Sequence, residues 1–234
     1  MTSTTQTRPG ASSAFAALLK REFTVELRTK TLLTSMSLFA VLCVVIVGLG
    51  GRGLANDETF QRFVLAMLWV CTLFAAVVGL NRAAISDQRR GFIHALLIAP
   101  HDAAIIYSVR LFSVLLLLLL TQAVIIGAAV PLLKLRFFDQ PLMLAVVPLA
   151  DIGVLAPGVL MASVTGRMRG GEAMLTILLL PLVVPVFAAA AGATDALHGG
   201  LGAAAALPYM LMLGICAAVY VGLGLLLFGR LNET

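Results

Sequence analysis

The sequence predicts an all-α, polytopic integral membrane protein with six transmembrane helices, an N-terminal interfacial elbow helix and a short cytoplasmic helix. Of its 234 residues 61% are hydrophobic and only 12% are charged, a composition too apolar for a soluble domain of this size. The apolar residues also fall in blocks, and each block approaches the roughly 20 residues needed to cross about 30 Å of hydrocarbon. We therefore expect a chain built almost entirely from membrane spans, without a separate soluble core.

The charged and sulfur-containing residues exclude several other classes of protein. The net charge of +5 could suggest nucleic acid as a partner, but the basic residues lie between the apolar blocks, where topology and lipid headgroups explain them. Cys43, Cys71 and Cys216 each lie alone inside an apolar run, without a C-x-x-C pair. The sequence therefore predicts no disulfide framework, no metal site and no covalently attached haem.

The N-terminal region precedes a single transmembrane domain, predicted over residues 14–234. Residues 1–13 are rich in Ser and Thr and are predicted to form a disordered tail. Residues 14–30 are predicted to form the elbow helix, although an ordinary basic flank is the alternative. Its apolar stripe recurs every four residues, at Phe15, Leu19, Phe23 and Leu27. The first apolar block begins near Leu32, behind this polar region, so it is expected to be a retained span rather than a cleavable signal.

Six apolar blocks are predicted to cross the membrane. The third is long enough to tilt or to extend past the bilayer. Six spans place both termini on the same side. The predicted spans cover about residues 32–50, 63–80, 103–133, 142–165, 173–194 and 201–228.

The distribution of Lys and Arg predicts which side faces the cytoplasm. Eleven basic residues lie on the side that carries the termini, against four in the opposite loops. Because basic residues favour the cytoplasmic side, both termini are predicted to be cytoplasmic. The sixteenth basic residue, Arg110, lies inside the third span near its cytoplasmic end. It could extend to the interface or form an ion pair within the bundle.

Residues 82–100 form the longest polar interruption between two apolar runs and are predicted to contain an amphipathic helix over about 87–99. Ser86 or Asp87 could cap its start, and Pro100 would end it. Phe92 and Leu96 are four residues apart and share a helix face. We expect this helix to lie at the membrane surface and to bind a soluble partner. The residues assigned to this contact are Asp87, Arg89, Arg90, Gly91, Phe92, Leu96 and Pro100.

Prolines and glycines mark the fourth and fifth spans as irregular. Pro148 and Pro157 interrupt the fourth span, and Pro181 and Pro185 interrupt the fifth. Such helices either move or face a substrate, or they carry static packing kinks. Between them, Arg169, Gly170 and Gly171 are predicted to form a tight cytoplasmic turn that could also contact a partner.

One carboxyl group is predicted to lie deep in the membrane. Asp151 is about ten residues into the fourth span, roughly 15 Å deep at 1.5 Å per residue. A carboxylate at that depth is costly. Either it binds an ion, a proton or a cationic partner, or it is a neutral, hydrogen-bonded acid within the bundle.

The sequence contains none of the motifs that would make it an enzyme. It has no G-x-x-x-x-G-K-[ST] loop for ATP, no H-E-x-x-H and no G-x-S-x-G. His198, predicted in an outer loop, could ligate haem iron but is more typical of a polar loop residue. Trp69 is the only tryptophan, so no aromatic platform for a flat cofactor is indicated.

Two groups of residues resemble a known family. The first comprises residues 66–71 (AMLWVC), 79–82 (GLNR) and 87–91 (DQRRG), and the second is residues 169–186 (RGGEAMLTILLLPLVVPV). Together they resemble the CcmB family of cytochrome c maturation proteins, also called haem exporter proteins B. The second group is the more specific, because a Gly-Gly turn opens a span with two prolines four residues apart. The resemblance runs through about residues 60–195, and the chain departs from the family pattern at Asn81 and Ala95.

The resemblance implies a membrane subunit of an ABC-type complex in the bacterial inner membrane. ATP would bind to a separate, CcmA-like cytoplasmic subunit, and CcmC-, CcmD- and CcmE-like membrane proteins would be further partners. Haem would be transported, or held by the chaperone, rather than bound covalently here, and two copies of the chain are expected per complex. The segment 87–99 would be the coupling helix, through which ATP-driven closure of the partner displaces spans two and three. An export permease for a lipid or drug, or a scaffold that transports nothing, remain the alternatives.

Overall fold

The described part of the protein is entirely helical. The computed structural model describes residues 31–51, 57–89, 103–135, 137, 139–166, 168 and 170–232, and these contain no strand. The helices are α2 (Thr31–Gly50), α3 (Glu58–Arg89), α5 (Ala103–Leu133), α6 (Met143–Thr165), α7 (Gly171–His198) and α8 (Gly202–Asn232). The all-α prediction is therefore confirmed over these residues.

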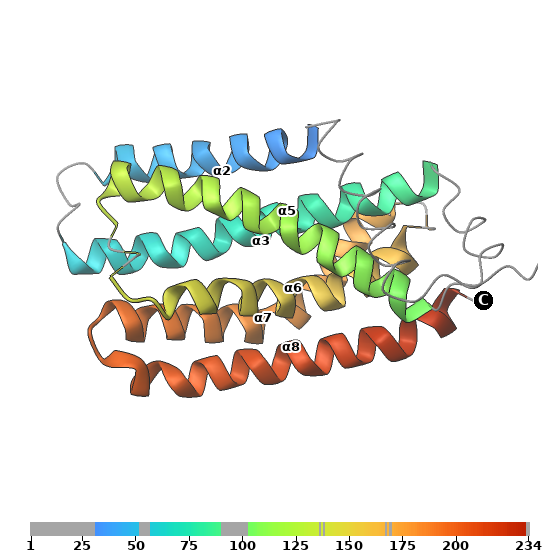
Figure 1. The fold of residues 1–234 in the computed structure, drawn as a ribbon. Coiled ribbons are helices and arrows are strands. Elements are labelled where there is room, and N and C mark those ends of the chain that lie inside the picture. Colours follow the sequence, from blue (N-terminus) through green and yellow to red (C-terminus); the bar gives the residue numbers. More distant parts are fainter. Residues whose placement is uncertain are drawn as a thin grey trace, which may run out of the picture.

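The helices form an antiparallel bundle in which the chain reverses direction from one helix to the next (Figure 1). The end of α3, the start of α5, the α6–α7 turn and the end of α8 lie at one end of the bundle (Figure 1). The segments that join α2 to α3, α5 to α6 and α7 to α8 lie at the other; we call this the loop end. Helix α6 contacts α3, α5, α7 and α8, and 72% of its most apolar 18-residue stretch is buried inside the bundle. Side chains of α6 are therefore best placed to join the others.

Five helices, α3, α5, α6, α7 and α8, are long and apolar enough to cross a membrane. They correspond to the second to sixth predicted spans. Helix α2 contributes a shorter apolar stretch, Ser37–Gly50, so the first span stays a prediction. The predicted tail and elbow helix, residues 1–30, lie outside the described residues.

Helix α3 is longer than the predicted second span. It begins beside Asp57, whose Oδ1 accepts hydrogen bonds from the backbone N–H groups of Thr59 (2.7 Å) and Phe60 (3.4 Å). It then continues past Leu80 to Arg89. The prediction that Ser86 or Asp87 begins a new helix is therefore wrong, because both lie within the last turns of α3. The rest of the predicted coupling helix falls in residues 90–102, outside the described residues.

Small residues allow α6 to approach its neighbours closely. A Cβ atom added to Gly158 would collide with Leu80 of α3, and one added to Gly153 would lie 3.0 Å from Val186 of α7. Leu80 is fully buried, so it has little room to move away. In lipid the hydrophobic effect does not drive helices together, because the lipid tails are as apolar as the side chains. Helices therefore associate through close packing of their backbones, which small residues allow.

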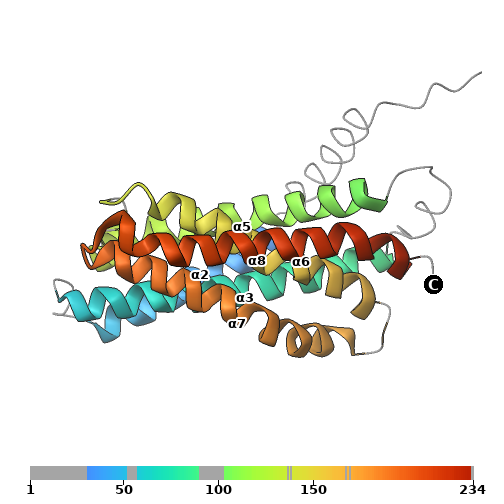
Figure 2. The same ribbon diagram turned by 90° about the horizontal axis from the view of Figure 1, so that it is seen from below.

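Helix α7 contains Pro181 and Pro185 without being interrupted, and it bends (Figure 2). Its N-terminal half diverges from α8 in that view. A proline removes a backbone donor and opens the preceding turn. The Tyr220 hydroxyl of α8 donates to the carbonyl of Leu182, at 2.9 Å, in that turn. A side chain from a neighbouring helix thus stabilises the bend.

Candidate functional site

Three helices place polar side chains against one another in the interior of the bundle. We call Thr72 of α3, Gln122 of α5 and Asp151 of α6 the central polar cluster; all three are buried, and Asp151 is 0% exposed. Gln122 Nε2 donates to Asp151 Oδ1 (2.9 Å) and to Thr72 Oγ1 (3.2 Å). Thr72 Oγ1 in turn donates to the carbonyl of Leu68 (3.0 Å). The cluster thus joins three helices through side-chain hydrogen bonds.

Two oxygen atoms of the central polar cluster are left without a partner. They are Asp151 Oδ2 and Gln122 Oε1, and both are buried. The sequence predicts that Asp151 lies deep in the membrane, and the structure places it at a fully buried position of α6. An unsatisfied polar atom in such a place is costly. The cluster is therefore a candidate site for a ligand, because two of these unpartnered atoms belong to one hydrogen-bonded group.

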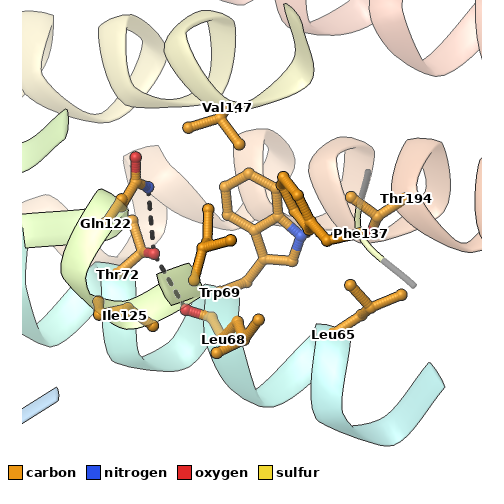
Figure 3. A pocket seen from close by; sticks show the side chains of 10 residues that line it. Leu65, Leu68, Trp69, Thr72, Gln122, Ile125, Phe137, Val147 and Thr194 are labelled. Carbon is orange, nitrogen blue, oxygen red and sulfur yellow. Dashed lines mark hydrogen bonds between the residues drawn. The ribbon is translucent and has the colours of Figure 1, made fainter. Parts of the chain in front are cut away.

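A small cavity adjoins the cluster on the side of the loop end (Figure 3). Its volume is about 30 Å³, and its lining is mostly apolar, with polar atoms from Thr72, Gln122 and Thr194. Asp151 lies one helical turn beyond Val147, which also lines the cavity. The space fits about one water molecule. It is far too small for a haem.

Trp69 forms one wall of the cavity and connects α3 to α7 (Figure 3). Its indole Nε1 donates to Thr194 Oγ1 at 3.3 Å, and its ring meets Phe187 edge to face with centroids 6.1 Å apart. Trp69 and Thr72 are three residues apart and so are neighbours on one side of α3. Any movement of α3 would therefore change both contacts together.

The loop end is also held by polar contacts. Gln61 Nε2 donates to the carbonyl of Lys134 (3.3 Å), where the backbone turns with φ 50°. Arg62 and Asp195 form an exposed ion pair at 3.5 Å. His198 was predicted in a loop, but it lies in the last turn of α7, so that placement is wrong. Among the described residues, no three His, Cys, Asp or Glu side chains gather as a metal site.

At the opposite end, Arg110 connects α5 to α3. Its Nη2 donates to the carbonyl of Ala83 at 2.6 Å. Whether the side chain also extends to the interface stays a prediction. The backbone of Asp87 and of Arg89 belongs to the last turn of α3. Arg90, Gly91, Phe92, Leu96 and Pro100 lie outside the described residues, so the predicted partner contact stays a prediction.

The predicted Gly-Gly turn between the fourth and fifth spans is present, although Arg169 lies outside the described residues. Gly170 precedes α7 with φ 78°, a left-handed conformation that favours glycine. Gly171 is buried against the backbone of Thr165, where a side chain would collide. The turn thus requires glycine for backbone reasons. A role in binding a partner is not needed to explain it.

Sequence reasoning missed Thr72, Gln122 and Thr194 as members of the site. Gln122 had a usable signal, because it is the only amide side chain in α5 and amides join helices in membranes. Thr72 and Thr194 had none, since isolated threonines are common in apolar helices. Hydrogen bonds between residues 50 and 125 positions apart carry no local pattern.

Comparisons with known proteins cover nearly the whole bundle. Residues 13–227 match the family described as CcmB protein. One relative is the heme exporter protein B of Pseudomonas aeruginosa, 25% identical over an alignment of 195 residues that covers 81% of this chain and 84% of the relative. The match extends from before α2 to the last turns of α8, so it includes the central polar cluster and the bent α7. The chain therefore belongs to the CcmB family.

Proposed function

We propose that this protein is the membrane-spanning permease subunit of an ATP-driven complex that exports haem for cytochrome c biogenesis. The observation that carries the proposal is the CcmB family match over residues 13–227, together with a relative named heme exporter protein B. The bundle of long apolar helices supports it, because such a subunit must cross the membrane several times. The membrane is the bacterial inner membrane, with both termini in the cytoplasm.

ATP hydrolysis takes place in a separate CcmA-like subunit, since the sequence has no phosphate-binding loop. That subunit binds the predicted coupling segment, residues 87–99. Phe92 and Leu96 enter an apolar slot, and Arg89 and Arg90 set the orientation by charge. The end of the bundle at which α3 ends also carries the α6–α7 turn and the end of α8 (Figure 1). Its basic residues support a cytoplasmic position.

Helix α3 passes the motion of the partner into the bundle. It is continuous from Glu58 to Arg89, so a displacement at the Arg89 end moves the whole rod. Three contacts carry that displacement onward. They are Arg110 with Ala83 to α5, Gly158 with Leu80 to α6, and Trp69 with Thr194 to α7. Helix α7, bent at its prolines, changes shape most easily in response.

The haem path lies outside the small cavity, which is far too small for a porphyrin. Two copies of the chain, with CcmC-, CcmD- and CcmE-like partners, would supply the larger surface that haem needs. The same displacement of α3 could instead drive the release of a haem-loaded, CcmE-like chaperone. In either case haem is transported or held by a partner, and is not bound covalently here.

Copurification with the ATP-binding subunit tests this proposal. Phe92→Asp should abolish copurification while the protein still inserts, because a charge cannot enter an apolar slot. Phe92→Leu is the matched control and should retain the partner. Haem absorbance of the purified complex, with and without ATP hydrolysis, then separates haem export from export of another substrate. Full copurification of the Asp variant would contradict the coupling role.

A further inference from the structure

The hydrogen bonds of the central polar cluster leave an excess of acceptors. Both N–H groups of the Gln122 amide are used, one by Asp151 Oδ1 and one by Thr72 Oγ1. The Thr72 hydroxyl is used by the carbonyl of Leu68. The N–H and O–H donors of Gln122 and Thr72 are thus all used, and the two atoms that remain, Asp151 Oδ2 and Gln122 Oε1, are oxygens.

Exchanging the oxygen and nitrogen of the Gln122 amide does not remove the imbalance. The present orientation gives both amide hydrogens an acceptor, at 2.9 and 3.2 Å. The opposite orientation would point the amide oxygen at the carboxyl of Asp151 and leave the NH₂ group unpartnered. The orientation with two free oxygens is therefore the better one, and the cluster still needs a donor or a cation.

No charged side chain neutralises Asp151 within the described structure. Its hydrogen bond is to Gln122, and α6 carries no other charged residue. The helices around it contribute charge only near their ends. These groups are Glu58, Arg62, Arg82, Asp87 and Arg89 of α3, Arg110 of α5, Glu172, Asp195 and His198 of α7, and Arg230 of α8. Tyr107, which is neutral, donates instead to the carbonyl of Ala156.

We propose that the central polar cluster is a binding site for one small monovalent cation, a hydrated proton or an alkali metal ion, held by Asp151 Oδ2 and Gln122 Oε1. One positive charge matches the single carboxylate. Both oxygens are buried, and they belong to groups that a 2.9 Å hydrogen bond already joins. This inference does not rest on haem export or on an ATPase partner.

The adjoining cavity sets the size of the ligand and its route. About 30 Å³ accommodates a small ion or a water molecule. The cavity extends from Gln122 toward Trp69 and Phe137, and so toward the loop end (Figure 3). The cation would therefore reach Asp151 from the side opposite the predicted coupling segment.

The test uses the full-length protein in lipid nanodiscs, with whatever partners copurify. Infrared difference spectra follow the carboxylic C=O band between about pH 5 and about pH 9. Thermal unfolding is recorded in sodium, potassium and choline chloride at equal ionic strength. The variant is Asp151→Asn, which keeps shape and removes the charge. The control is Asp195→Asn, because Asp195 is an exposed carboxyl on the same bundle.

A band that titrates in the wild type and in Asp195→Asn but is lost in Asp151→Asn identifies a proton as the ligand. A Tm that rises and saturates with sodium or potassium but not choline, again only when Asp151 is present, identifies an alkali ion. Gln122→Met removes the amide, Oε1 included, at similar size. It should lower the apparent affinity for the cation about tenfold in either measurement. A constant band together with equal Tm in all three salts would overturn the proposal, because Asp151 would then be a permanently neutral structural acid.

Discussion

The close contact between α6 and α3 gives a prediction whose size can be worked out. In Gly158→Ala the new Cβ atom meets Leu80, which is fully buried and cannot swing into solvent. Inserting a methyl group into a filled interior costs about 1–3 kcal/mol. Replacing glycine by alanine in a helix also gains up to about 1 kcal/mol in propensity. The net effect on the free energy of unfolding therefore needs a reference that contains the propensity gain alone.

Gly127 of α5 provides that reference. A Cβ atom there has nothing within 4 Å, so Gly127→Ala should be neutral or slightly stabilising. The difference between the two variants then isolates the clash, and we expect about 1–3 kcal/mol in reversible unfolding from mixed micelles. In a Leu80→Ala background, the added cost of Gly158→Ala should be smaller, and the difference gives the coupling energy between the two positions. Equal stabilities for Gly158→Ala and Gly127→Ala would show that α3 and α6 are not in close contact.

Three further changes probe single contacts. Asp57→Ala should lower the free energy of unfolding by about 0.5–2 kcal/mol, because the first N–H groups of α3 lose their cap, whereas Asp57→Asn should be nearly neutral in the same measurement. Tyr107→Phe should cost about 0.6–1.7 kcal/mol through the lost 3.1 Å bond to the Ala156 carbonyl, measured by unfolding. Trp69→Phe removes the donor to Thr194 but keeps an aromatic ring. It should leave insertion and ATP hydrolysis intact while lowering the haem transferred per ATP, and an unchanged ratio would contradict the proposed role of α3.

Hydropathy predicted the apolar segments well but not the ends of the helices. The second span was ended at Leu80 because Asn81 and Arg82 follow it. Hydropathy, however, records how much of a helix lies in hydrocarbon, and backbone hydrogen bonds do not stop at the interface. Helix α3 therefore continues to Arg89. The polar residues Asn81 and Arg82 therefore indicate where α3 leaves the hydrocarbon, and not where the helix ends.

The site was predictable in part. Asp151 was identified because a carboxyl group inside an apolar run is conspicuous. Its partner Gln122 lies 29 residues away, on a helix whose rotation about its axis the sequence leaves free. The cavity depends on how the side chains of several helices fit together, and no periodicity reports that. Such features follow from packing, so they appear only once the helices are placed.

Helix α3 both transmits the proposed displacement and contributes Thr72 to the central polar cluster, and this connects the two proposals. Trp69 and Thr72 are both on α3, so a displacement that strains the Trp69–Thr194 bond also shifts the partner of Gln122. Gln122 would then hold Asp151 and the cation differently before and after ATP hydrolysis. Linkage is reciprocal for binding equilibria, so whatever factor nucleotide binding applies to cation affinity, the cation must apply to nucleotide affinity. Helix α6 is suited to detect the change because it packs against α3, α5, α7 and α8 and carries Asp151 as its single charge.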